Sequence, residues 1–185
     1  MRTPIFEQIK KYFLYFFMYS IIGWLYEVFL EVVVYRWGYS DRGILFGPYC
    51  PVYGFGALLF LFLVYPMIKR KKLQTRLLLL PVVFLLCALS ATLLELITSY
   101  LCEAVLGSWP WQTYSQYAIN FQARIALSPS IRFGIGGVVF LYLLQPLFEK
   151  LTTALPPKIL TFLFGILSVL FVADLFSTII LHIFT

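Results

Sequence analysis

The sequence predicts an all-α fold, a polytopic bundle of about five membrane-spanning helices that forms one integral membrane domain over residues 1–185. Two observations predict it. Hydrophobic residues make up 62% of the chain and charged residues 12%, with a mean hydropathy of +0.91, whereas soluble domains carry about 25% charged residues. The apolar residues also form runs that approach the roughly 20 helical residues needed to cross a bilayer core. The lipid bilayer is therefore the first expected partner.

Five apolar runs, taken in order, account for most of the chain. The first is bounded by Lys11 and Arg36, and the second follows a stretch rich in glycine and proline. Pro156 and Pro157 mark the start of the last run, because the missing N–H of proline costs least in the first turn of a helix. The predicted spans cover about residues 12–35, 52–68, 77–103, 131–148 and 159–184.

Residues 104–130 do not fit the pattern of a simple span. They carry few charges but include Trp109, Trp111 and several amides, a composition typical of an interfacial loop or of a re-entrant segment packed against protein. A full crossing would give six spans. We expect a broken or re-entrant element near these residues.

The net charge of +6 reflects membrane topology. Five basic residues crowd the loop 69–76 between two apolar runs, a pattern typical of a cytoplasmic loop and not of a nucleic-acid surface. With a cytoplasmic N-terminus, ten basic residues lie inside and four lie outside, namely Arg36, Arg42, Arg124 and Arg132. Five spans then predict a multi-pass protein with its C-terminus outside and no affinity for nucleic acid.

Acidic residues inside apolar spans need a partner or a purpose, because each costs on the order of 2.5–3.5 kcal/mol to insert. Glu27 and Glu31 lie one helical turn apart on the first span, and Glu95, Ser99 and Glu103 repeat this spacing on the third. One interpretation is a set of buried pairs with arginine that orient helices. The other is a polar pocket, open to the outer face, that binds a cation or a polar headgroup.

Several buried carboxylates are best accommodated when they share solvation. We therefore expect Glu27 and Glu95 to face one another across a shared pocket, with Arg42 or Arg124 within pairing distance. Asp174, in the middle of the last span, has no basic partner in that span. We expect it either to stay protonated or to find a donor on another helix, with a hydrogen bond to a hydroxyl or backbone group and with Asp174→Asn tolerated for folding.

The stretch 42–56 contains four glycines and two prolines where the second span should begin. Broken backbone at membrane depth persists only when it is buried in protein or lines a cavity, and in transporters it presents backbone dipoles to a solute. The alternative interpretation is that these glycines allow helices to pack closely. Tyr49 and Tyr53 suit either solute binding or an aromatic belt at the membrane interface.

These patterns define a set of candidate ligand-binding residues: Glu27, Arg42, Gly47, Tyr49, Tyr53, Glu95, Ser99, Glu103 and Arg124. The sequence contains no GxSxG, HExxH or P-loop motif, and its three cysteines lack metal-type spacing. Its one histidine lies at the end of the last span. We assign no catalytic residue and expect no metal and no cofactor.

Three segments carry a family resemblance: YSIIGWLYE at 19–27, RG…GPYCPVYG at 42–54, and LELITSY at 94–100 followed by Glu103. Over roughly residues 12–140 the chain resembles the bacterial family CmpB of putative ABC-transporter permeases. The resemblance implies a small multi-spanning protein of the bacterial inner (cytoplasmic) membrane with a role in transport. In the family pattern an acid follows the tryptophan pair and Asn-Gly precedes the arginine, whereas this chain has Gln112 and Gln122-Ala123. A site that depended on that acid would be altered here.

The first functional hypothesis is a membrane transport or solute-binding component whose carboxylate and arginine pocket opens to the outer face. The sequence has no ATP-binding motif, so an ATP-driven role requires a separate ATPase subunit. A permease core is typically larger than five helices, which favours a homodimer or another membrane partner. The alternative is an intramembrane enzyme or lipid-handling protein that acts on a headgroup or lipid-soluble substrate with the same polar residues. A structural accessory subunit is a third hypothesis.

Overall fold

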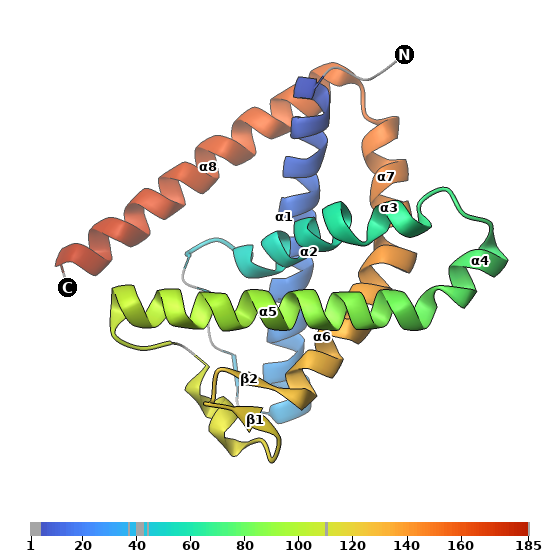
Figure 1. Cartoon of the computed structure of the whole chain (residues 1–185). Helices are drawn as coiled ribbons and strands as arrows, with labels where there is room; N and C mark the ends of the chain where they lie inside the picture. Colours follow the sequence, from blue (N-terminus) through green and yellow to red (C-terminus); the bar gives the residue numbers. More distant parts are fainter. Residues whose placement is uncertain (1–4, 37, 40–42, 44, 110, 185) are drawn as a thin grey trace. The chain divides into compact units, whose positions relative to one another are not determined.

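The computed structural model describes residues 5–36, 38–39, 43, 45–109 and 111–184. Figure 1 shows the order of its helices and of one short hairpin. The chain forms two compact units. The first unit consists of Met1–Leu58 and Leu147–Thr185, and the second of Leu59–Pro146.

The first unit is built on two long helices, α1 (Ile5–Phe29) and α8 (Pro157–Phe184). Helix α1 continues as a π-helical segment, Leu30–Tyr35, and ends at Arg36, whose φ is 56°. Helix α2 (Pro51–Leu63) starts in this unit and α7 (Gln145–Ala154) ends in it. Prolines stand in the first positions of α2 and α8, where a missing N–H breaks no intrahelical hydrogen bond.

An aromatic core joins the loop before α2 to α1. Leu45 and Tyr49 from the loop are buried with Phe16 and Phe17, and Phe171 of α8 packs against this cluster. The rings of Tyr49 and Phe17 meet edge to face with centroids 5.5 Å apart, an arrangement that aromatic quadrupoles favour. The loop is thus held to α1 by side chains although its backbone is irregular.

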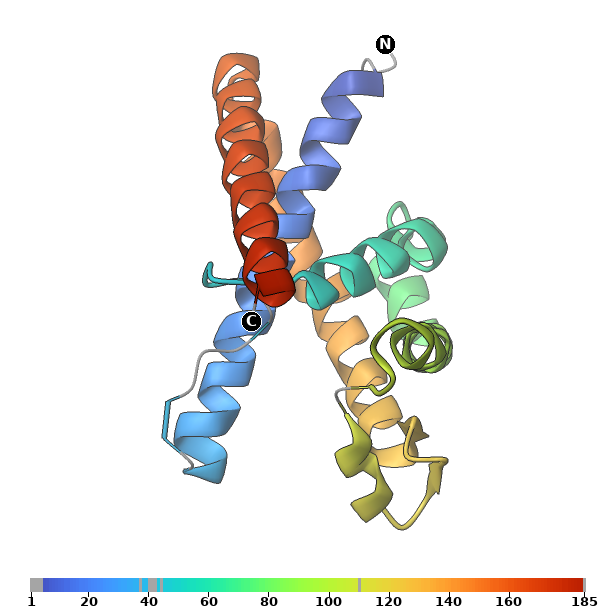
Figure 2. The same ribbon diagram turned by 90° about the vertical axis from the view of Figure 1, so that its left-hand side faces the viewer.

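The second unit contains α3 (Tyr65–Ile68), α4 (Leu73–Leu78), α5 (Leu80–Leu106) and α6 (Leu127–Val139), which continues as a π-helical segment, Phe140–Leu144. Between α5 and α6 lie a 3-10 helix, Gln112–Gln116, and the antiparallel strands β1 (Asn120–Phe121) and β2 (Ile125–Ala126). Asn120 is opposite Ala126, and Phe121 is opposite Ile125. Both ribbon views place this hairpin beside α5 and the start of α6 (Figures 1 and 2).

Glycines allow α5 and α6 to approach closely. A Cβ atom on Gly134 would lie 2.6 Å from the ring of Phe84, and one on Gly137 would lie 2.5 Å from the sulfur of Cys87. The hydroxyls of Thr92 and Ser130 also form a 2.7 Å hydrogen bond across the same interface. Small residues and a polar link are the usual means of joining helices where lipid removes the hydrophobic driving force.

The predicted all-α membrane bundle is confirmed, with a difference in the second span. Four of the described helices are long and apolar enough to cross a membrane: Ile5–Tyr35, Leu80–Val105, Leu127–Ala154 and Pro157–Ile180. The second predicted span is divided, because α2 has only 13 residues, about 20 Å of helix, and is separated from α3 at Val64. Residues 107–126, where described, form the broken element that the composition predicts.

Candidate functional site

A nearly fully buried arginine is the centre of the polar cluster in the second unit. Arg124 is 5% exposed, and its guanidinium donates to Glu103 at 2.5 Å and to Ser99 at 3.4 Å. The same guanidinium stacks on the rings of Tyr100 and Trp109, with its central carbon 4.1 and 3.9 Å from their centroids. Arginine suits this place because its planar group hydrogen-bonds at its edge and stacks on its face.

A strained hairpin turn presents Arg124 to helix α5. Gln122 and Ala123 have φ values of 52° and 55°, and the N–H of Arg124 donates to the carbonyl of Phe121 at 2.9 Å. Two consecutive left-handed residues closed by this hydrogen bond form a type I′ turn. Asn and Gly are the residues that adopt this geometry at least cost, so the Asn-Gly of the CmpB pattern has a backbone explanation.

Two tryptophans hold the turn in place. The indole N–H of Trp109 donates to the carbonyl of Ala123 at 3.1 Å, and that of Trp111 donates to the carbonyl of Arg124 at 2.9 Å. Trp109 therefore supports the turn with its N–H and covers the guanidinium with its ring. The tryptophan pair therefore supports the turn, a structural role that the composition of residues 104–130 did not predict.

Glu95 lies two helical turns before Glu103 on α5 and has a different partner. The hydroxyl of Tyr114 donates to Glu95 Oε1 at 2.8 Å. Burial and the neighbouring Glu95 carboxylate raise the pKa of Tyr114 above its ordinary value, so this hydroxyl remains a donor. Within the part of the chain that the structure describes, Glu95 Oε2 and Arg124 Nε are buried without a hydrogen-bond partner.

The cluster formed by Glu95, Ser99, Glu103, Tyr114 and Arg124 thus combines a held cation with an acceptor oxygen that is not used. A buried polar atom without a partner costs about 1–3 kcal/mol, and such atoms concentrate where a ligand or water completes the network. A polar solute that offers a donor to Glu95 Oε2 would remove this cost. We call these five residues the Arg124 cluster.

The first unit holds a second group of predicted residues. The hydroxyl of Tyr53 donates to Glu27, and the ring of Tyr53 lies directly over Gly23, where a Cβ atom would overlap it. Gly54 of the same helix lies against Ser20, with no room for a side chain. Glu27 is therefore paired with a tyrosine, and the glycines serve close packing of α2 on α1.

Asp174 of α8 accepts three hydrogen bonds from the irregular loop. The N–H groups of Phe46 and Gly47 donate at 2.9 Å each, and the hydroxyl of Tyr49 donates at 2.5 Å. The predicted hydrogen bond of Asp174 to a hydroxyl or backbone group is confirmed, but its donors lie in the loop before α2 and not on another helix. Burial, together with the Asp174 carboxylate, raises the pKa of Tyr49, so its hydroxyl stays protonated.

The predicted candidates therefore fall into three groups. Ser99, Glu103 and Arg124 come together, and Glu95 on the same helix is bonded to Tyr114. Glu27 pairs with Tyr53, and Gly47 and Tyr49 bind Asp174. Arg42 lies outside the described residues. Glu27 belongs to the first unit and Glu95 to the second, and the shared pocket between them stays a prediction.

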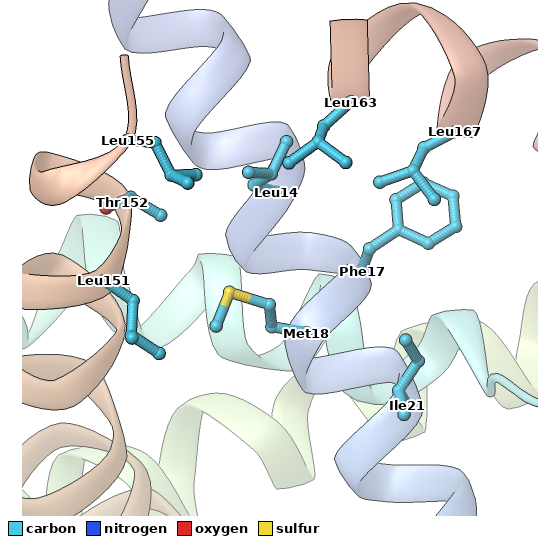
Figure 3. A pocket seen from close by; sticks show the side chains of 9 residues that line it. All are labelled: Leu14, Phe17, Met18, Ile21, Leu151, Thr152, Leu155, Leu163 and Leu167. Atoms are coloured by element: carbon cyan, nitrogen blue, oxygen red, sulfur yellow. The ribbon is translucent and has the colours of Figure 1, made fainter. Parts of the chain in front are cut away.

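An apolar groove in the first unit was not predicted from the sequence. It has a volume of about 290 Å³ and is lined by side chains of α1, of α8 and of the end of α7. Figure 3 shows Leu14 and Met18 of α1 opposite Leu151, with Leu163 and Leu167 of α8 on the other side. Its one hydroxyl, on Thr152, already bonds to Tyr15 and to the carbonyl of Phe148. Water would find few partners here, so the groove suits an apolar occupant.

Comparison with known proteins gave one finding. The model of the family described as "Putative ABC-transporter type IV", ABC_trans_CmpB, matches residues 14–179. The searches of curated proteins and of solved structures found no match.

Proposed function

Because the chain belongs to the family described as "Putative ABC-transporter type IV", we propose that it is the membrane-embedded component of an ABC-type transport system. The apolar helices place it in a membrane. We assign it to the bacterial inner membrane with the N-terminus and the basic loop 69–76 in the cytoplasm, on the distribution of its basic residues. A separate ATPase subunit supplies the ATP hydrolysis, and a second copy of the chain completes the permease core.

The Arg124 cluster is the proposed solute contact. The observation that carries this proposal is an unused hydrogen-bond acceptor in the cluster. Within the described residues Glu95 Oε2 is buried without a hydrogen-bond partner, while the buried Arg124 of the hairpin contacts Ser99 and Glu103 on the same helix α5. Purely architectural pairs are normally satisfied on all their atoms. A solute with a donor group, such as an amine, a hydroxyl or an ammonium, completes the network.

Native mass spectrometry of protein released directly from membrane vesicles tests this proposal. We expect wild-type protein to carry a small-molecule adduct that is lost in Glu95→Gln and in Arg124→Gln. Glu149→Gln in the first unit is the matched control and should keep the adduct. Wild-type protein without any small-molecule adduct, or an adduct that survives Glu95→Gln, would contradict the proposed site.

A lipid-handling role is the second candidate, and the apolar groove favours it. An acyl chain is the occupant that matches an apolar lining between helices long enough to cross a membrane. The same experiment separates the candidates, because Leu151→Trp fills the groove. A phospholipid adduct that is lost in Leu151→Trp and kept in Glu95→Gln supports lipid handling over solute transport.

A further inference from the structure

The loop before α2 builds an oxyanion site, and a carboxylate of the chain itself occupies it. The N–H of Phe46 points at Asp174 Oδ1, while the N–H of Gly47 and the hydroxyl of Tyr49 point at Oδ2. Both oxygens of one carboxylate are therefore held by neutral donors. Successive backbone N–H groups that converge in this way form an anion-binding nest.

The local sequence Gly-Pro-Tyr produces the nest. The N–H of Tyr49 donates to the carbonyl of Gly47 at 2.7 Å, which closes a three-residue γ-turn around Pro48. A Cβ atom on Gly47 would overlap the ring of Tyr49, so only glycine lets the tyrosine fold back and aim its hydroxyl at the same oxygen. Proline sets the φ angle of the central residue of this turn.

The donors are held in place by contacts other than the one to Asp174. Tyr49 and Leu45 are each 8% exposed and pack against Phe17 in the aromatic core. The N–H of Cys50, directly after the turn, donates to the carbonyl of Ser20 on α1 at 2.9 Å. The nest is thus anchored on α1 and needs no carboxylate to keep its shape, which is the preorganisation that favours anion binding.

Helix α8 is attached lightly. Only 6% of the residues in its most apolar window are buried, against 28% in α1. Beyond Asp174, the apolar side chains Leu175, Phe176, Ile179 and Ile180 are all exposed. Thr178, one turn after Asp174, is buried and only 6% exposed, and the three hydrogen bonds to Asp174 join this part of the helix to the loop.

We propose that the turn Phe46–Tyr49 is a binding site for the carboxylate or phosphate group of a ligand, and that Asp174 is a tethered occupant which the ligand displaces. Both groups present two oxygens on one atom, as Asp174 does here. Displacement of Asp174 releases the part of α8 that follows this residue, so ligand binding is coupled to a movement of that part of the helix. The site lies wholly in the first unit and does not depend on the Arg124 cluster.

Chemical rescue tests the site. Asp174→Ala empties the nest, and its thermal stability in phosphatidylcholine nanodiscs is measured with added phosphate or acetate against chloride at equal ionic strength. We expect both anions to stabilise Asp174→Ala and to bind it at least tenfold more tightly than wild-type protein, because the tethered competitor is gone. Adding Tyr49→Phe should weaken this binding roughly tenfold, since one hydrogen bond to a charged group is lost.

Two further arms identify the source of the anion and control for the substitution. Nanodiscs containing phosphatidylglycerol, measured in chloride alone, test a lipid headgroup. Stabilisation by phosphate or acetate identifies a soluble ligand, and stabilisation only by phosphatidylglycerol identifies a lipid. Ser177→Ala is the control, because in the described part of the chain its hydroxyl donates to the carbonyl of Ala173 on its own helix, and it should behave like wild-type protein.

Wild-type protein provides a second readout that does not depend on the folding of Asp174→Ala. A spin label at Phe176, which is 64% exposed and follows Asp174 by half a turn, should become more mobile on addition of phosphate, acetate or phosphatidylglycerol. Asp174→Ala that responds to none of the three above the chloride control overturns the proposal. If that variant does not fold, an unchanged spectrum of the labelled wild-type protein overturns it.

Discussion

The turn that presents Arg124 to its cluster is strained at Gln122 and Ala123. Both residues adopt the left-handed conformation, which costs an ordinary L-residue roughly 1–2 kcal/mol. The turn is retained because the two tryptophans bond to the carbonyls of Ala123 and Arg124 and the guanidinium of Arg124 stacks on Trp109. Strain of this kind persists only where surrounding contacts determine the backbone.

Ala123→Gly should therefore stabilise the protein, by about 1 kcal/mol, because glycine adopts a φ of 55° without steric cost. The midpoint of thermal unfolding in detergent measures the change. Ala126→Gly, at a residue with an ordinary extended φ of −147°, is the control and should destabilise. A lower midpoint for Ala123→Gly would show that the turn is not strained.

Single residues also mark the limit of what the sequence predicts about the site. The one-turn spacing of Glu95, Ser99 and Glu103 correctly placed them on one helix face, and Arg124 was correctly matched to that face. The roles of Trp109, Tyr100 and Tyr114 were missed, because aromatic residues near a membrane are ordinarily explained by the interfacial belt. Their contacts depend on a type I′ turn. The sequence Gln122-Ala123 does not predict such a turn, because Asn and Gly are the residues that favour it.

At the scale of elements, the packing of α5 on α6 depends on which glycine of a pair faces the neighbouring helix. A Cβ atom on Gly137 would lie 2.5 Å from the sulfur of Cys87, whereas one on Gly136 meets nothing within 4 Å. The two glycines are adjacent on one helix, so they share helix propensity and depth. They differ in whether an added Cβ atom would meet helix α5.

Gly137→Ala should destabilise the protein by about 1 kcal/mol or more, because overpacking typically costs 1–3 kcal/mol and exceeds the gain in helix propensity. Gly136→Ala should instead stabilise by roughly 0.5–1 kcal/mol, since alanine is the better helix former. Unfolding of both variants in detergent at graded denaturant measures the difference. Equal effects of the two substitutions would mean that α5 and α6 do not meet at this face.

The elements themselves were largely predictable. Long apolar runs identify α1, α5 and α8 because a bilayer demands length and composition together. The division of the second span at Val64 was not predictable, because both sides of it are apolar. The π-helical segments at Leu30–Tyr35 and Phe140–Leu144 also leave no signal in hydropathy, since their side chains are as apolar as those of an α-helix.

At the scale of the whole molecule, the basic residues make a topological prediction. Lys72 belongs to the basic loop and Gln116 to the 3-10 helix, and both are exposed. Single cysteines at positions 72 and 116, in a background with the three native cysteines replaced, should be labelled from opposite sides of the membrane by an impermeant maleimide. Labelling of both from the same side would refute the proposed arrangement.

The proposal that this chain is the membrane component of an ABC-type system rests on its family, and ATP hydrolysis by a captured complex is the most direct test of that proposal. The tagged chain is captured from its own bacterial membranes in a mild detergent, and ATP hydrolysis by the captured complex is measured with and without vanadate. We predict vanadate-sensitive hydrolysis that is absent from a parallel capture of an unrelated tagged membrane protein. Capture of the folded chain without a nucleotide-binding subunit and without vanadate-sensitive hydrolysis would contradict the account.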